Sequence, residues 1–300
     1  MEKVKEFFDH NYKKLLIIPL LVMLISIGII LNHKMQTGDY IDKDITLKGG
    51  VSVTVSTTKN VDIISLEKDL KSRYPNSDIR IRSITDAGKN AGVVIALTEV
   101  TPDQISDYVK QKLSVSSDDL AIESTGAALG ASFFNETIRA ILFAFAFMAI
   151  VIFLYFRIPI PSLAIILAPI CTMFGTWAVL ILIGAKLSTA GVAAMLMLIG
   201  YSVDTDILLT VRVLKRKSGV SIFEATTGAF KTGMIMTTTA IAVVGTCYFL
   251  STSVVLKQIM LILLIGLFFD ILNTWIQNAG ILRMYLEKKG DKIKLHDQLN

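Results

Sequence analysis

The amino-acid sequence predicts a polytopic α-helical membrane protein with six transmembrane helices and one extracytoplasmic α+β domain. Hydrophobic residues make up 53% of the 300 residues and charged residues only 18%, whereas charged residues are about 25% of a typical soluble domain. Six apolar segments are long enough to cross a bilayer, and a long polar region separates the first segment from the second. This pattern excludes an ordinary soluble protein.

The first apolar segment, residues 15–31, follows a lysine-rich polar stretch of residues 1–14. A basic start followed by an apolar run is also typical of a secretory signal peptide. This run ends in Leu31-Asn32-His33-Lys34 without a small-residue cleavage site, so we expect an uncleaved first transmembrane helix. The other five segments lie within residues 136–283, at 138–156, 162–183, 187–209, 233–250 and 254–282, and residues 284–300 form a polar tail.

The polar region, residues 32–135, contains both strand and helix patterns. Alternating apolar residues predict strands at 50–57, 78–85, 91–97 and 119–124, and apolar residues at helical spacing predict helices at 61–74 and 101–113. The second helix has a start signal of Thr101, Pro102 and Gln104. The resulting order β-α-β-β-α-β is the split βαβ pattern, which predicts a ferredoxin-like domain.

Basic residues at the ends of the apolar segments predict the orientation in the membrane. Cytoplasmic loops carry an excess of Lys and Arg, and here fifteen of them fall on one side while only Lys186 and Lys257 fall on the other. We therefore expect a protein of the plasma (cytoplasmic) membrane with both termini cytoplasmic and the α+β domain outside. The fifteen residues are Lys3, Lys5, Lys13, Lys14, Arg157, Arg212, Lys215, Arg216, Lys217, Lys231, Arg283, Lys288, Lys289, Lys292 and Lys294.

Three carboxylates lie inside the apolar segments and are the candidate functional residues. Asp204 and Asp206 are in the fourth segment, and Asp270 is in the sixth, about 20 Å along the helix from Arg283 at 1.5 Å per residue. A charge at this depth costs at least about 2.5 kcal/mol, so such a residue normally faces a partner or water. The residues either form an ion or proton pathway or lock the packing of the helices, and the sequence leaves both readings open.

Other polar residues reach the same depth as the carboxylates. Asp204 is eight residues, or about 12 Å, from Arg212, and Thr237 and Thr238 lie six and seven residues beyond Lys231 at the edge of the fifth segment. These residues complete the set of candidates for an ion or proton relay. No phosphate-binding loop or metal-ligand spacing occurs in the chain, so we expect no enzyme activity, no cofactor and no metal.

Short motifs in the right order resemble the SecF family of protein-export membrane proteins, in its archaeal form. The run from Asp44 to Gly49 and Gly50 is similar to the Asp-Leu-x-Gly-Gly signature that SecD and SecF share after their first helix. The run 130–133, followed by the segment ending at Arg157, resembles the entry into the second helix. Gly200-Tyr201-Ser202-Val203 with Arg212 resembles the fourth-helix motif. The resemblance covers nearly the whole chain and implies half of a resistance-nodulation-division (RND) membrane unit.

The chain departs from the bacterial pattern in the fourth and fifth segments. Bacterial SecF proteins usually read Asn-Asp after Gly-Tyr-Ser-x, whereas this chain reads Asp204-Thr205-Asp206, and Lys231 replaces a usual arginine. Asp204 matches the position of the fourth-helix aspartate of SecD. We therefore expect Asp204 to face the bundle and Asp206, about 200° away around the helix, to turn toward Arg212 or a partner subunit.

The resemblance implies a subunit of the Sec machinery that assists preprotein translocation and uses the proton-motive force. Its implied partners are a SecD-like membrane protein, a SecY-type channel, the preprotein and membrane lipids, with no role for nucleic acid. Two other interpretations remain open. One is an RND-type exporter of lipids or small hydrophobic molecules, and the other is a passive membrane scaffold without an ion pathway.

Overall fold

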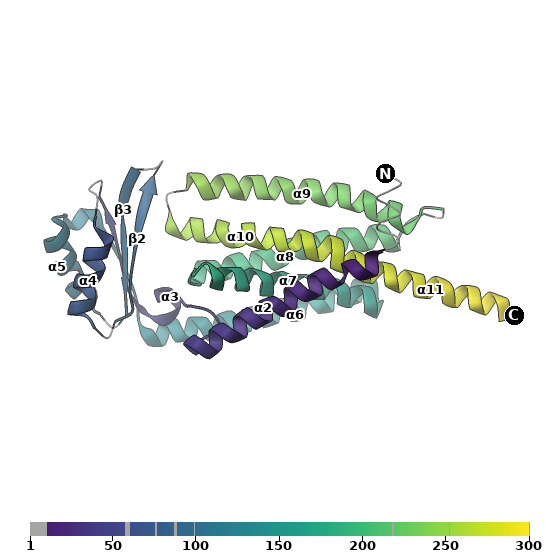
Figure 1. The fold of residues 1–300 in the computed structure, drawn as a ribbon, viewed down its shortest axis with the longest axis horizontal. Helices are drawn as coiled ribbons and strands as arrows, with labels where there is room; N and C mark the ends of the chain where they lie inside the picture. Colours follow the sequence, from purple (N-terminus) through teal and green to yellow (C-terminus); the bar gives the residue numbers. More distant parts are fainter. Residues whose placement is uncertain are drawn as a thin grey trace.

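A computed structural model describes residues 11–57, 61–75, 77–86, 89–98, 100–217, 219–251 and 253–299. It places an α+β domain at one end of a bundle of long helices (Figure 1). Within the described residues, six helices have the length and the apolar composition needed to cross a membrane. The predicted fold class, with six spans and a separate α+β domain, is therefore confirmed.

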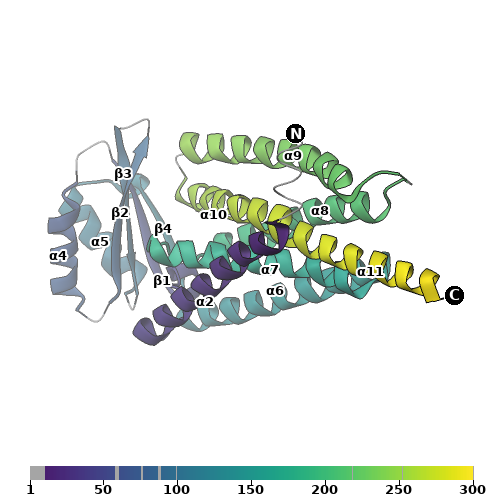
Figure 2. The same cartoon turned by 45° about the vertical axis from the view of Figure 1, so that its right-hand side comes forward.

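The domain has one four-stranded sheet in the order β2-β3-β1-β4, and all neighbouring strands are antiparallel. Two helices lie on the side of the sheet away from the bundle (Figure 2). This arrangement confirms the predicted ferredoxin-like topology. The elements are β1 (Gly50–Ser56), α4 (Ile63–Arg73), β2 (Ile79–Asp86), β3 (Lys89–Leu97), α5 (Pro102–Leu113) and β4 (Leu120–Thr125).

The alternation of residues along β1 decides which face of the sheet is buried. Val51, Val53 and Val55 point into the core beneath α4 and α5 and are at most 2% exposed. Ser52 and Thr54 point to the opposite face, because successive side chains of a strand alternate between its two sides. That second face is turned toward the bundle and lines a cavity of about 430 Å³ at the junction.

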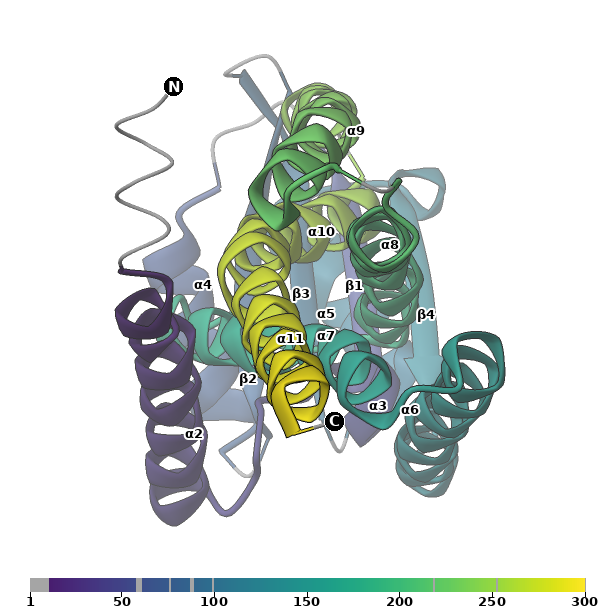
Figure 3. The same ribbon diagram turned by 90° about the vertical axis from the view of Figure 1, so that its right-hand side faces the viewer.

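The bundle is built from helices of unequal burial. Seen along its long axis, α8 lies at the edge of the bundle between α9 and α6, while α2 lies on the opposite side (Figure 3). Helices α7 and α8 have the largest share of buried residues among the six spans, although one face of α8 is turned outward and exposed. The helices are α2 (Ile17–Thr37), α6 (Ala127–Phe156), α7 (Pro159–Leu182), α8 (Thr189–Leu214), α9 (Ile222–Leu250), α10 (Val254–Leu272) and α11 (Ala279–Leu299), with a π-helical segment, η2 (Asn273–Asn278), joining the last two.

Several helices extend further than their apolar segments predicted. Helix α6 begins at Ala127, so the predicted domain boundary after residue 135 falls inside a helix, and the domain's last strand ends at Thr125. Helix α9 begins at Ile222 and α8 ends at Leu214, so the connection between them is much shorter than the predicted 211–232. An apolar run marks only the part of a helix that lies in the hydrocarbon core of the bilayer. The backbone hydrogen bonds of the helix can continue past the ends of that run.

The motif after the first span attaches the domain to the bundle. The backbone N–H of Asp44 donates to Leu187 O (2.8 Å), and the N–H of Leu187 donates to Asp42 O (2.7 Å). The short helix α3 (Ile45–Lys48) follows, and Gly49, with φ of 86°, makes the turn into β1. A glycine adopts this left-handed backbone conformation without strain, so the motif provides the turn between the bundle and the domain.

Candidate functional site

The structure reverses the expected roles of the two carboxylates of α8. Asp206 is fully buried in the bundle, and Asp270 of α10 is 1% exposed. Asp204 is exposed on the outer surface of the bundle. Our expectation that Asp204 faces the bundle and Asp206 faces Arg212 or a partner is therefore wrong. The two residues diverge because they are about 200° apart around one helix.

Hydroxyl groups of α8 and η2 surround the carboxylate of Asp270. Ser202 Oγ donates to Asp270 Oδ1, and Thr274 Oγ1 donates to the same oxygen at 3.4 Å. Thr205 Oγ1 lies 3.2 Å from Asp270 Oδ2 and 2.9 Å from the carbonyl oxygen of Ser202, two acceptors for its single proton. The carboxylate is thus held by uncharged donors, and no basic residue within the described part of the chain forms an ion pair with it.

Asp206 forms the second half of the site. Asn278 Nδ2 donates to Asp206 Oδ1 at 2.8 Å, while Asp206 Oδ2 has no hydrogen bond of good geometry, although the Thr274 hydroxyl lies near this carboxylate. The carboxylate is also close enough to Asp270 for the two charges to interact. Arg212 is bonded elsewhere: the Nη1 atom of Arg212 donates to Gly228 O at 2.6 Å. Two buried carboxylates within electrostatic range repel each other when both are ionised, which disfavours the state in which both carry a charge.

The π-helical segment η2 supplies most of the polar groups that the sequence reading missed. Asn273, Thr274, Gln277 and Asn278 are all at most 6% exposed. A π-helical turn inside an α-helix is uncommon and occurs frequently at functional sites. The signal in the sequence was the polar run Asn-Thr-Trp-Ile-Gln-Asn within an otherwise apolar segment.

The predicted residues of α9 are divided between the interior and the surface. Thr237 is fully buried, and its hydroxyl lies near that of Tyr201 without a hydrogen bond of good geometry. Thr238 and Lys231 are exposed. Of the candidates on this helix, only Thr237 is therefore placed toward the buried carboxylates.

The residues of the family motifs are not all at this site. Ser202 is in the carboxylate network, with Tyr201 half-buried and Gly200 exposed beside it. Asp44, Gly49 and Gly50 are instead at the junction between the domain and the bundle. The first motif thus positions the domain, and only the fourth-helix motif contributes to the buried carboxylate site.

An ion pair at the junction adds to the backbone contacts there. Lys186 Nζ, in the connection between α7 and α8, donates to Asp78 Oδ2 at 3.1 Å. Burial acts to raise the pKa of Asp78, but the hydrogen bond and charge of Lys186, with Lys48 and Arg80 nearby, hold that pKa below its usual value. Burial lowers the pKa of Lys186 despite its bond to Asp78. The lowered pKa of Asp78 favours the charged aspartate, whereas the lowered pKa of Lys186 disfavours the charged lysine. The lysine side chain is 6% exposed and that of the aspartate 42%, so the lysine carries the larger desolvation cost.

The fold and the site define a class of protein: a six-span membrane protein with an α+β domain and a buried carboxylate pair. The family model "Protein export membrane protein SecD/SecF, C-terminal" matches residues 104–288. The SecF protein of Pyrococcus furiosus is 35% identical over 97% of both chains. That of Methanocaldococcus jannaschii is 37% identical over 94% of this chain and 99% of its own. The chain therefore belongs to the SecF family of protein-export membrane proteins.

Solved structures of SecDF share the fold, and two of them are compared with this chain. One is the crystal structure of SecDF, a translocon-associated membrane protein, from Thermus thermophilus, with a TM-score of 0.76 at 18% identity over 93% of this chain. The other is SecDF in a super-membrane-facing form, with a TM-score of 0.59 at 17% identity over 96% of this chain. The chain spans 38% and 40% of the lengths of these two SecDF chains.

Proposed function

We propose that this chain is the SecF-type subunit of the Sec protein-export machinery and that it works only when paired with a SecD-like membrane protein. The observation that carries the proposal is the position of Asp204, exposed on the bundle surface ten residues before the end of α8. An aspartate facing lipid near the centre of a helix costs about 2.5–3.5 kcal/mol. A polar or basic group of a partner helix removes that cost.

The face of α8 around Asp204 is suited to close helix packing. Ala193, Met197, Gly200 and Asp204 are all exposed, at spacings of four, three and four residues, which places them on one side of the helix. Small residues on such a face let another helix approach closely in a membrane. The SecDF chain from Thermus thermophilus is more than twice as long as this chain, and we infer that a separate SecD-like protein packs against this surface here.

The buried pair supports the second part of the proposal, which is coupling to the proton-motive force. Asp206 and Asp270 are the enclosed acids, and hydroxyl and amide groups rather than basic residues surround them. When one carboxylate of such a pair takes up a proton, no basic residue loses its ion-pair partner. We propose that this proton exchange drives assistance to a preprotein leaving a SecY-type channel. The chain itself catalyses no reaction on a small molecule.

Contact with the partner is testable at the α8 face. A photoreactive residue at Met197 should cross-link to a SecD-like protein that co-purifies with the chain, whereas one at Leu24, an exposed residue of α2, should not. Helix α2 lies on the opposite side of the bundle from α8 (Figure 3). Asp204→Ala should leave the chain inserted but reduce co-purification. Cross-linking of two copies of this chain through Met197 would instead support the RND-type exporter, working as a homodimer. A symmetric pair would, however, bring two Asp204 carboxylates together.

Orientation is a separate part of the proposal. The excess of Lys and Arg on one side supports a plasma-membrane protein with both termini in the cytoplasm. Cysteines introduced as Lys71→Cys on α4 and Lys289→Cys on α11, both exposed positions, should react with an impermeant thiol reagent from opposite sides of the membrane. Reaction of both from the same side would contradict the six-span orientation.

A further inference from the structure

Helix α8 packs along the continuous helix formed by α10, η2 and α11, and we call this contact the seam. Polar groups along the seam are distributed unequally on the two sides of Asp270. On the side away from the domain, the seam contains Asp206, Thr210, Gln277 and Asn278, all buried. Each of these residues has a polar atom without a hydrogen bond of good geometry: Asp206 Oδ2, Thr210 Oγ1, Gln277 Nε2 and Asn278 Oδ1. Thr274 lies near Asp206, and Cys171 lies near Gln277. Because buried polar atoms in proteins are nearly always hydrogen-bonded to protein or to water, these four atoms indicate bound water along this part of the seam.

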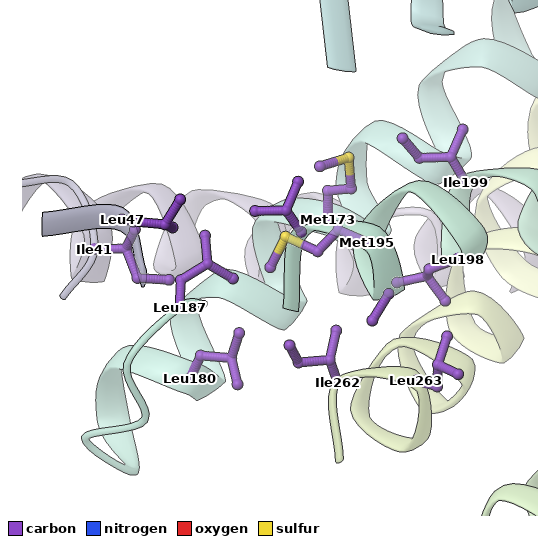
Figure 4. Close-up of a cluster of buried hydrophobic side chains, with 12 residues drawn as sticks. Ile41, Leu47, Met173, Leu180, Leu187, Met195, Leu198, Ile199, Ile262 and Leu263 are labelled. Carbon is purple, nitrogen blue, oxygen red and sulfur yellow. The ribbon is translucent and has the colours of Figure 1, made fainter. Parts of the chain in front are cut away.

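On the side toward the domain, the same seam is apolar. Leu198 packs against Gly266 so closely that a Cβ on Gly266 would overlap the leucine side chain. Met195, Ile262 and Leu263 continue this packing toward the domain (Figure 4). The next polar side chains on this seam are Ser188 and Gln258, which bond to each other at 2.6 Å. Ser188 is fourteen residues from Ser202, or about 21 Å along the helix.

We propose that Asp206 and Asp270 exchange protons with the membrane side opposite the domain, through water held by Thr210, Gln277 and Asn278. The Leu198–Gly266 contact is the barrier that closes the pair from the domain side. The exchange is a simple transfer of a proton between water and a carboxylate oxygen. This inference rests on the proposed function, in which the side opposite the domain is the cytoplasm, and it adds the route and the barrier.

The other groups that face the pair do not offer an alternative route. Tyr201 of α8 lies within electrostatic range of Asp270, and Cys171 of α7 faces Gln277. Helix α9 presents the hydroxyl of Thr237, and its Lys231 is exposed. The apolar cluster that contains Leu209, Val213 and Trp275 packs against α9. Gln277 is turned toward α7 instead. The polar route therefore runs along the side of η2 that faces α7.

The test measures from which side the carboxylates receive protons. Dicyclohexylcarbodiimide crosses membranes and converts a protonated buried carboxyl group to a stable N-acylurea, which mass spectrometry detects on the peptides containing Asp206 and Asp270. Membrane vesicles of both orientations, holding the full chain with its co-purifying partner, are kept at pH 5.5 on one side and pH 8 on the other. In the wild type, modification should follow the pH of the side opposite the domain.

Variants of the barrier make the test specific. Leu198→Ala should open the domain side, so that modification rises several-fold when that side alone is acidic. Leu24→Ala, at an exposed position of α2 outside the proposed partner face, is the control and should behave as the wild type. Adding Gly266→Ala to Leu198→Ala returns a methyl group to the opened space and should restore one-sided modification, which separates loss of the barrier from general loosening of the fold.

Three results would overturn the inference. These are modification that follows the domain side in the wild type, modification that responds to neither side, and equal behaviour of Leu198→Ala and Leu24→Ala. The readout does not depend on export. One-sided modification in a chain that fails to bind a SecD-like partner would therefore count against the proposed function and leave the route and barrier intact.

Discussion

Removing the hydroxyl of Ser202 is the sharpest test of the network around Asp270. Ser202 is fully buried, and its Oγ donates to Asp270 Oδ1. A hydrogen bond to a charged group contributes about 1.5–3 kcal/mol, against about 0.5–1.5 kcal/mol for a neutral pair. Thr274, at 3.4 Å, is a weaker donor to the same oxygen. We therefore expect Ser202→Ala to lower the free energy of unfolding by about 1.5–3 kcal/mol if Asp270 is ionised, and by about 1 kcal/mol if it is protonated.

A double-mutant cycle separates this bond from the loss of packing. Unfolding in detergent micelles is measured for the wild type, Ser202→Ala, Asp270→Asn and the double variant, and the two changes should couple by at least about 1 kcal/mol. Thr246→Ala on α9 is the control, because its exposed hydroxyl bonds only to its own helix, and it should change stability by less than about 0.5 kcal/mol. Equal losses from Ser202→Ala in both backgrounds would refute the network.

Two further predictions concern the junction and the α9 face. The lowered pKa of Asp78 means that its stabilising contribution is present above the unfolded value of about 3.9 and is lost as pH falls through the lower folded value. Hydrogen exchange at the Leu187 amide, corrected for its intrinsic rate, should therefore accelerate below that pH, and Asp78→Asn should remove this transition. Gly233→Ala places a Cβ into the ring of Trp275 and should destabilise the fold by about 1–3 kcal/mol. In contrast, Gly245→Ala, whose nearest neighbouring atom is 3.9 Å away, should be neutral or stabilising; equal effects of the two changes would show that the Trp275 contact is unimportant.

The sequence predicted the spans and the order of the domain elements because both follow from local patterns. The alternation of Val51, Val53 and Val55 determines which face of β1 is buried wherever the strand lies in the sheet. The start signal at Thr101 forms the expected capping box with Gln104. In both cases the responsible groups are only a few residues apart in the chain.

The orientation of α8 could not be predicted in the same way. Most of the helix is apolar on every side, because both lipid and the neighbouring helices favour apolar residues, so no amphipathic pattern indicates which face is inside. Asp204 was assigned to the interior from its position in a sibling family, whereas packing against α10 and η2 places Asp206 there. The π-helical segment was missed because a local change in hydrogen-bond spacing has no hydropathy signal.

The central claim is that the buried pair Asp206–Asp270 couples proton uptake to protein export. The most direct measurement is export of a secreted protein into membrane vesicles that contain this chain and its SecD-like partner, with and without an imposed proton gradient. Asp206→Asn and Asp270→Asn should leave the complex assembled but abolish the stimulation by the gradient, while the control Leu24→Ala on α2 retains it. Full gradient-dependent stimulation in both asparagine variants would contradict the account and favour a passive scaffold.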